Sequence, residues 1–163
     1  MSIENAYNQE AKDKIKELAE GIDFNMMVTN LYEKPPHTQS MSTKKVDSDG
    51  NIWFLSSTKN EHLMNLQVNN EVQLLYSKPN SMKFLSVFGK ADIVNDRAIF
   101  EERYQSTDDA WFEGIDYPNL RAISVSPIVA KYWEPKNNKA ITLLKMAYGA
   151  VTESKTEVGK EES

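Results

Sequence analysis

Three consecutive hydroxyl residues, Ser56, Ser57 and Thr58, are the part of the sequence best placed to bind a ligand. They follow the apolar run Ile52–Leu55, which is typical of a β-strand. Behind them, apolar residues recur at helical spacing over 59–69. A strand, a hydroxyl-rich turn and a helix start in this order direct hydroxyls, backbone N–H groups and the positive end of a helix dipole toward one point. Such an arrangement suits a phosphate group.

The same residues also have a purely structural interpretation. Thr58 and Glu61 stand at the spacing of a capping box, in which each side chain accepts a hydrogen bond from the other residue's backbone N–H. Many helices begin in this way and bind nothing. The local pattern therefore leaves both a phosphate site and a simple helix start open.

Several other kinds of chemistry are not supported by the sequence. The two histidines, His37 and His62, have no partner at the spacing of metal ligands. There is no cysteine, which excludes disulfides, thiol catalysis and cysteine-bound metal. A glycine-rich phosphate loop is absent, and no Ser-His-Asp arrangement can be argued. We therefore predict no metal site and identify no catalytic acid or base.

The composition is that of an ordinary globular protein. Of 163 residues, 40% are hydrophobic and 26% are charged, and the net charge is −5. A negative chain without a long basic face is a poor partner for nucleic acid or an anionic membrane. No apolar run approaches the length of a membrane helix. We expect one domain over 1–152, a charged and disordered tail over 153–163, and a cytoplasmic location.

The elements before the hydroxyl cluster are predicted to be a helix and two strands. Apolar residues at intervals of three and four predict an amphipathic helix over 3–20, with Gly21 as its C′ residue. A strand is expected over 23–33, ended by Lys34-Pro35-Pro36. The next strand, 37–46, is unusually polar, so it forms a sheet edge or lines a polar ligand site, and the edge is the simpler interpretation.

After the cluster the chain is predicted to consist of strands with a few helices. In the strand 83–94, Gly89 indicates a bulge or a close approach by another group. We expect Asp47-Ser48-Asp49-Gly50 to form a hairpin tip, Asn95-Asp96 to cap a helix, and Pro127 to interrupt the last strand region. The remaining predictions are strands at 71–77, 120–126 and 128–133, and helices at 97–105, 107–112 and 140–151. The expected fold class is mainly β (α+β), a small barrel of six to seven mostly antiparallel strands with peripheral helices.

An ordered set of short motifs carries a resemblance to a known family. The set resembles the FMN-binding split barrels that are similar to pyridoxamine 5′-phosphate oxidase, and it covers about residues 5–150. The Trp111-Phe112 pair is similar to the bacterial general stress protein branch of that family. The motifs are Pro36–Met41, Asp47–Gly50, Trp53–Ser57, Val87–Ala91, Ala110–Phe112 and Tyr132–Pro135.

This resemblance implies a homodimeric split β-barrel that holds FMN, or sometimes FAD, in a groove at the subunit interface. Residues 39–41 would run beside the isoalloxazine ring, and residues 55–57 would meet the ring or the ribityl-phosphate. Two residues at the helix start would face the phosphate, and two tryptophans would reach across from the partner chain. The implied cofactor-binding residues are Gln39, Ser40, Met41, Leu55, Ser56, Ser57, Lys59, His62, Trp111 and Trp133.

Two positions depart from the family pattern. Gln39 stands where the family usually has Arg, and His62 stands where it usually has Lys. Because a charge-assisted hydrogen bond contributes about 1.5–3 kcal/mol and a neutral one about 1 kcal/mol, these changes weaken FMN binding by roughly one to three decades. Lys59 or the pair Lys44-Lys45 would compensate, and His62 would gain charge beside a phosphate. The negative charge of Glu61 acts against this compensation and would weaken phosphate binding.

The resemblance therefore predicts a flavin-binding, oxidoreductase-like general stress protein whose catalytic residues are unknown. An alternative is a non-catalytic ligand-binding split-barrel protein with weak or lost flavin binding, or with another planar ligand such as a tetrapyrrole. A third alternative is a deazaflavin-dependent reductase.

Overall fold

The computed structural model describes residues 7–135 and 137–145, and the side chains of 9–135. Among these residues, eight strands form one sheet. The strands are β1 Asn25–Thr29, β2 His37–Met41, β3 Lys45–Val46, β4 Ile52–Ser57, β5 Glu71–Lys78, β6 Lys83–Val94, β7 Leu120–Glu134 and β8 Asn137–Lys145. The helices are the π-helix η1 Tyr7–Ala11, α2 Lys12–Gly21, α3 Glu61–Val68, the 3-10 helix η2 Pro79–Ser81, α4 Arg97–Arg103 and the 3-10 helix η3 Ser106–Ala110.

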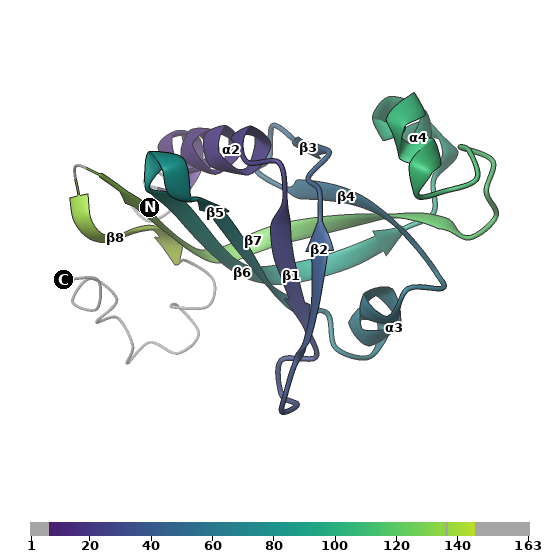
Figure 1. Cartoon of the computed structure of the whole chain (residues 1–163), viewed down its shortest axis with the longest axis horizontal. Coiled ribbons are helices and arrows are strands. Elements are labelled where there is room, and N and C mark those ends of the chain that lie inside the picture. The colour runs from purple at the N-terminus through teal and green to yellow at the C-terminus, as the bar shows by residue number, and fades with distance from the viewer. Residues whose placement is uncertain (1–6, 136, 146–163) are drawn as a thin grey trace.

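The sheet curls into a half-open barrel (Figure 1). Its strand order is β2-β1-β5-β6-β7-β4-β3, with β8 beside β7, and every described pair is antiparallel. β2 and β3 lie at opposite ends of this path, yet only residues 42–44 separate them in the chain. The two sheet edges therefore meet at an unpaired gap, which we call the split. Thr43 Oγ1 and Tyr76 Oη, 2.5 Å apart, form a hydrogen bond between the 42–44 connection and β5.

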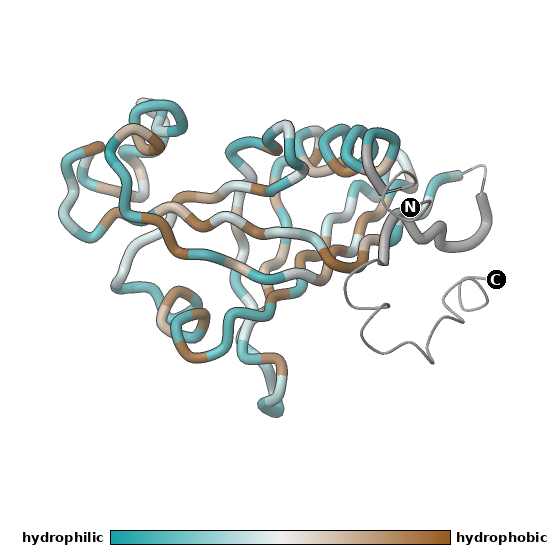
Figure 2. Tube along the Cα trace, turned by 180° about the vertical axis from the view of Figure 1, so that it is seen from behind, coloured by the Kyte–Doolittle hydropathy of each residue, from teal (hydrophilic) through white to brown (hydrophobic). Residues whose placement is uncertain are grey.

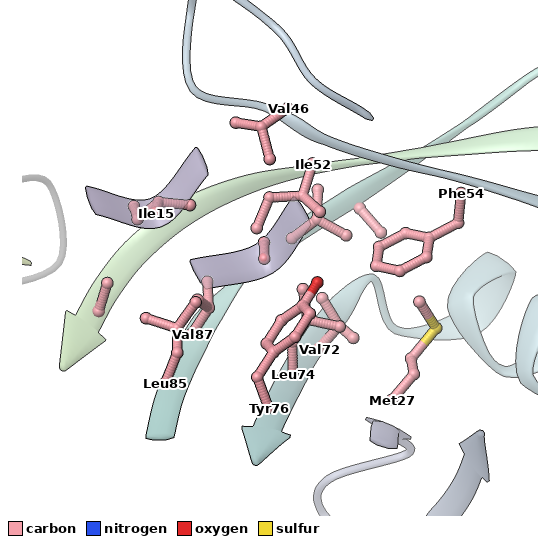
Figure 3. Packing of buried hydrophobic residues seen from close by; sticks show 14 of the residues in the cluster. Ile15, Met27, Val46, Ile52, Phe54, Val72, Leu74, Tyr76, Leu85 and Val87 are labelled. Atoms are coloured by element: carbon pink, nitrogen blue, oxygen red, sulfur yellow. The ribbon is translucent and has the colours of Figure 1, made fainter. Parts of the chain in front are cut away.

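The inner face of the sheet carries the main core. Figure 3 shows Met27, Phe54 and Tyr76 from three different strands turned toward one another, with Ile15 of α2 at the other side of the same cluster, above Val87. Phe54 and Met27 are fully buried, and burial of a side chain of this size contributes about 1.5–3 kcal/mol. The hydrophobic residues of α2 lie on its strand-facing side (Figure 2), so this helix closes one end of the barrel.

A second apolar cluster lies on the outer face of β4. Successive residues of a strand point to opposite faces, and β4 buries both: Phe54 joins the main core, whereas Trp53 and Leu55 pack with Phe100 of α4 and Leu120 of β7. Figure 1 shows α4 standing over this end of the sheet. The apolar run of the sequence is thus explained by burial on both sides.

The predicted fold class is confirmed, and several local predictions agree with the structure. β6 has the predicted bounds, and Asp96 accepts a hydrogen bond from Ala98 N to cap α4. The 47–50 hairpin tip forms, with Gly50 N donating to Asp47 O. β2 lies at a sheet edge, as its polarity suggested.

Both the bulge and the close approach that were predicted for Gly89 are present. The register of β6 against β7 shifts between Phe88 and Gly89, and a Cβ on Gly89 would lie 2.3 Å from Ser126 O. The predicted interruption at Pro127 is wrong, because β7 runs unbroken from 120 to 134. Pro127 is opposite Gly89, at the irregularity where a proline is tolerated in a sheet.

Other corrections concern element ends. The predicted strand 37–46 is two strands, because residues 42–44 cross the split. Gly21 is the last residue of α2 rather than its C′ residue, and the chain leaves the helix at the extended Ile22. Part of the predicted 3–20 helix is the π-helix η1, and residues 3–6 lie outside the described part of the chain.

The predicted helix 140–151 is wrong over 140–145. This segment belongs to β8. β4 pairs with residues 120–125 of β7, and β8 pairs with residues 129–134 of the same strand, which β4 leaves free. Pairing with an available strand edge overrides the local helical pattern. Residues 146–151 and the predicted tail at 153–163 lie outside the described residues.

Candidate functional site

The turn between β4 and α3 uses its hydroxyl groups within the protein. Ser57 Oγ accepts a hydrogen bond from Lys59 N at 3.1 Å and lies 3.3 Å from Tyr117 Oη. Thr58 Oγ1 donates to Asn119 Oδ1 at 2.7 Å. These bonds fix the turn against the segment that enters β7.

The predicted capping box between Thr58 and Glu61 is wrong, because Thr58 is bonded to the Asn119 loop. α3 begins at Glu61 with Asn60 as the N-cap residue, and no side chain caps the helix. The Asn60 amide instead donates to Ser56 Oγ at 3.1 Å. The first N–H groups of α3 therefore have no side-chain acceptor, as at an anion-binding helix start.

His62 lies buried between α3 and β4. It is 2% exposed, and its Nε2 is 2.8 Å from Ser56 Oγ. Burial, together with the nearby His37, lowers the pKa of His62 to about 4, so the ring is neutral at pH 7. Its Nδ1 is buried without a hydrogen-bond partner. In this environment the ring does not supply the positive charge that a phosphate contact would use.

His37, at the first position of β2, lies against His62. The two rings are stacked with centroids 6.4 Å apart and an interplanar angle of 18°. His37 Nδ1 is 3.5 Å from Glu61 Oε2, and its Nε2 is buried without a partner. His37 was not predicted as a site residue from the sequence. The available signal was strand alternation, which places His37 on the same face as Gln39 and Met41.

The three β2 residues predicted to contact a ring divide between two faces. Gln39 pairs in register with the fully buried Met27, so it points to the inner side of the sheet at the split. Met41 packs against the main core, whereas Ser40 pairs with Met26 on the outer face. The Gln39 side chain is exposed and donates to Ser40 O at 3.3 Å. Of these three residues, one polar and one apolar side chain therefore face the split.

The predicted residues of β4 divide in the same way. Ser56 points inward to His62, whereas Leu55 and Ser57 belong to the outer face beneath the second cluster. The structure therefore brings Ser56 and His62 together and adds His37 to them. Leu55 and Ser57 lie on the opposite face of the same strand.

The lysines proposed as phosphate partners differ in their surroundings. Lys59 is exposed in the β4–α3 turn, and Lys45 is exposed on β3. Lys44 is 12% exposed and forms an ion pair with Asp108, whose Oδ2 is 2.8 Å from its Nζ. Lys44 is therefore already engaged with a carboxylate.

The two tryptophans predicted to reach across from a partner lie far from each other. Trp111 is 77% exposed at the end of η3. Trp133 is partly buried near the end of β7, where it pairs with Phe84. Ser57 pairs with Leu120 at the opposite end of β7, so about 40 Å of strand separates Trp133 from the β4–α3 turn of the same chain.

The described residues contain no group of three or more His, Cys, Asp or Glu side chains that could hold a metal ion. Over the same part of the chain, no helix has the length and apolar character needed to cross a membrane.

Comparisons with known proteins agree with this architecture. The model of the family described as pyridoxamine 5′-phosphate oxidase like matches residues 10–157. No curated protein matches the chain.

Among solved structures, a protein from Clostridium acetobutylicum related to general stress protein 26 is 24% identical, with a TM-score of 0.69 over 85% of this chain and 96% of that one. General stress protein 26 from Bacillus anthracis is 18% identical, with a TM-score of 0.66 over 76% and 94% of the two chains. A general stress FMN/FAD binding protein from Xanthomonas citri is 23% identical, with a TM-score of 0.66 over 79% and 92%. These likenesses establish a shared fold.

Proposed function

Because the chain belongs to the pyridoxamine 5′-phosphate oxidase-like family, we propose that it is a flavin-binding, oxidoreductase-like general stress protein of the cytoplasm. Its cofactor is FMN, with FAD as the other possibility, and it acts without nucleic acid or membrane. Support comes from the family and from a structural relative of the same fold that is described as FMN/FAD binding. We place the cofactor at the split, between β2 and the β4–α3 turn.

The observation that carries this placement is the set of unsatisfied polar groups there. His37 Nε2 and His62 Nδ1 are buried without partners, and the start of α3 is uncapped. An unsatisfied buried polar group costs about 1–3 kcal/mol, so such groups call for an explanation such as a ligand. A flavin carries hydroxyls and ring heteroatoms that can bond these nitrogens, and a phosphate that suits a helix start. The residues present therefore fit a flavin.

Each residue has a proposed role in holding the flavin. The β2 residues run beside the isoalloxazine ring, and those of β4 meet the ring or the ribityl-phosphate. Because Ser40, Leu55 and Ser57 lie on the outer face of their strands, this placement requires the flavin to reach both faces at the sheet edge. Lys59 and His62 stand nearest the phosphate, and the two tryptophans are contributed by the partner subunit. The proposed set is Gln39, Ser40, Met41, Leu55, Ser56, Ser57, Lys59, His62, Trp111 and Trp133.

The protein is proposed to be a homodimer with the cofactor groove at its interface. Met26 and Leu75 pair in register on the outer face of the sheet and are 41% and 44% exposed. Phe24 and Trp111 are exposed as well. Exposed apolar side chains that lie together, as Met26 and Leu75 do, mark a candidate interaction surface. Trp133 lies too far along β7 to reach the β4–α3 turn of its own chain, which also favours a second copy.

The bound flavin supplies electron and hydride transfer. The chain orients the ring against β2 and excludes water with the apolar residues of the interface. The described side chains do not single out a catalytic acid or base at the split.

Flavin uptake is the direct test. The purified protein is expected to be yellow, or to take up FMN or FAD at about 100 μM, a concentration that fills a site of micromolar Kd. The bound flavin should quench and shift in fluorescence, and the complex should oxidise NAD(P)H steadily. A colourless protein that binds neither flavin at this concentration would contradict the proposal.

One observation favours a second candidate, a non-catalytic split-barrel protein with weak flavin binding. His62 is neutral, and Gln39 bonds only its own strand neighbour, so two cations usual in the family are missing here. Flavin-loaded protein that shows no NAD(P)H oxidation would support this candidate over an oxidoreductase.

A further inference from the structure

The structure places a neutral buried histidine and a carboxylate at the start of α3. His62 is buried and uncharged, and the Glu61 carboxylate lies in the first turn of the helix, 3.5 Å from His37 Nδ1. Lys44 is held by Asp108. A phosphate brought to this point would therefore meet a carboxylate and no buried cation among these residues.

The hydroxyl groups of the turn contribute little to phosphate binding, because they already have hydrogen-bond partners within the protein. Ser57 Oγ and Thr58 Oγ1 are engaged with Lys59 N and Asn119, and Ser56 Oγ is shared between Asn60 and His62. Lys59 remains as an exposed cation in the turn. Attraction between solvent-exposed charges changes affinity by less than about fivefold and is screened by salt.

The groups that the split does offer are suited to an uncharged ligand. His37 Nε2 and His62 Nδ1 are both buried and unpartnered on stacked rings. An imidazole nitrogen donates when it carries a proton and accepts when it does not. A hydroxyl group donates and accepts as well, so it can pair with either nitrogen in either tautomer. A polyol chain presents several such hydroxyls in succession.

We propose that flavin recognition in this protein is directed at the ribityl hydroxyls, through His37 and His62, and depends little on the phosphate. This inference rests on the proposed flavin function and specifies the part of the flavin that is read. Riboflavin, FMN and FAD share the ribityl chain, so they bind with similar affinities. Of the two histidines, His37 is the one that moves, because it begins the edge strand and its side chain is 20% exposed. Its ring turns aside to admit the ligand.

Fluorescence titration of the full chain with three probes tests the proposal. The probes are riboflavin, FMN, and lumiflavin, which has the same ring system without ribityl hydroxyls. Riboflavin and FMN are expected to bind within about fivefold of each other, and lumiflavin at least about tenfold more weakly, which is the loss of about 1.4 kcal/mol. The His37→Phe variant retains a stacked ring without nitrogens, so it should weaken riboflavin and leave lumiflavin unchanged. Unchanged lumiflavin binding also shows that the variant is folded.

Each other outcome has a defined meaning. FMN binding more than tenfold tighter than riboflavin would overturn the inference and leave the flavin function standing. Equal losses of riboflavin and lumiflavin in His37→Phe, or no loss of either, would overturn the role of the histidines. His37→Gln, which keeps polar atoms at a partly exposed position, replaces His37→Phe if the latter does not fold. Failure of all three flavins to bind would overturn the proposed function together with the inference.

Discussion

The imidazole of His62 stacks on that of His37 with ring centroids 6.4 Å apart, which links the start of α3 to the first residue of the edge strand β2. Ser56 fixes the far side of this pair through its 2.8 Å bond to His62 Nε2. The His62 ring is neutral at pH 7, and the Glu61 carboxylate lies 3.5 Å from His37 Nδ1. Substitutions that add positive charge near these histidines should therefore have a direct effect on the binding of a phosphorylated flavin.

Restoring positive charge at the split should favour phosphorylated flavins. The double variant Gln39→Arg and His62→Lys is expected to tighten FMN about tenfold or more, because two charge-assisted contacts become available. Riboflavin lacks the phosphate and loses the proposed bond between His62 and its ribityl chain, so its affinity should not rise. The gain should also shrink as salt is raised, because the charges are screened. Flavin fluorescence titration at two salt concentrations measures all three effects.

Thr38→Arg provides the matched control. Thr38 pairs with Val28 and lies on the opposite face of β2 from Gln39. The substituted arginine therefore adds the same charge one residue away, but it does not face the split. It should change FMN affinity less than Gln39→Arg does. Equal tightening of FMN and riboflavin in the double variant would show that the phosphate does not lie at the start of α3. Since His62 is buried, thermal denaturation must accompany the titration to separate weakened folding from weakened binding.

Association through the outer face of the sheet is expected to depend on Leu75. Light scattering should find dimers of the natural chain at micromolar concentration. Leu75→Glu places a charge in the apolar pair with Met26 and should shift the protein toward monomers. Gln67→Glu adds the same charge on the exposed side of α3 and serves as the control. Monomers in the natural chain would contradict both the dimer and the placement of the groove at its interface.

The strand framework could be predicted because local signals marked its ends. β6 was predicted with its observed bounds, since a proline turn precedes it and the Asp96 helix cap follows. The bulge at Gly89 could be predicted because glycine inside a strand permits a close approach. The 140–145 strand could not be predicted, because it exists only where β7 offers a free edge.

The site could be predicted less completely than the fold. The hydroxyl turn was found from the order of strand, turn and helix, and His62 from the resemblance to the family. The contact of His37 with Glu61 was not, because it joins residues 24 positions apart through the packing of α3 on β2. Thr58 matched a capping box in sequence, yet the Asn119 loop supplied a competing tertiary partner. Local patterns identify candidates, whereas their partners are decided by long-range packing.

Gly89 is expected to be intolerant of a side chain. A Cβ there would lie 2.3 Å from Ser126 O and 3.2 Å from Pro127 Cα, both backbone atoms. Gly89→Ala should therefore lower the free energy of unfolding by about 1–3 kcal/mol, the usual cost of overpacking. Gly21→Ala is the matched comparison, because nothing lies within 4 Å of its Cβ position in α2, and it should stabilise by about 0.4–1 kcal/mol. Urea denaturation of the two variants measures both signs, and equal effects would contradict the proposed close approach.

Asp47 is expected to stabilise the β3–β4 hairpin in a pH-dependent way. Its Oδ2 accepts from Trp53 Nε1 at 2.8 Å, and its Oδ1 accepts from the backbone N–H groups of Asn51 and Asp49, both at 2.9 Å. Burial raises the pKa of the carboxyl group, but the hydrogen bonds from Trp53 and the two backbone donors outweigh it, and the net pKa is lowered below 3.8. The ionised carboxylate therefore favours the folded state. Its contribution is fully present well above pH 3.8, the usual pKa of the group, and is lost as the pH falls through the lower pKa of the folded protein.

Asp47→Asn tests this contribution, because the amide can still accept a backbone hydrogen bond on one atom but presents a donor to Trp53 on the other. It should lower the free energy of unfolding at pH 7 by about 1–2 kcal/mol, as for hydrogen bonds to a partly exposed charged group. As the pH falls below 3.8, the natural chain should lose this stabilisation while the variant does not, so the difference between them should narrow. Asp49→Asn, at an exposed position in the same turn, should change stability by less than about 0.5 kcal/mol. Urea denaturation at pH 7 and at several values below 3.8 measures the difference, and a difference that stays constant across this range would show that the charge of Asp47 is not what stabilises the hairpin.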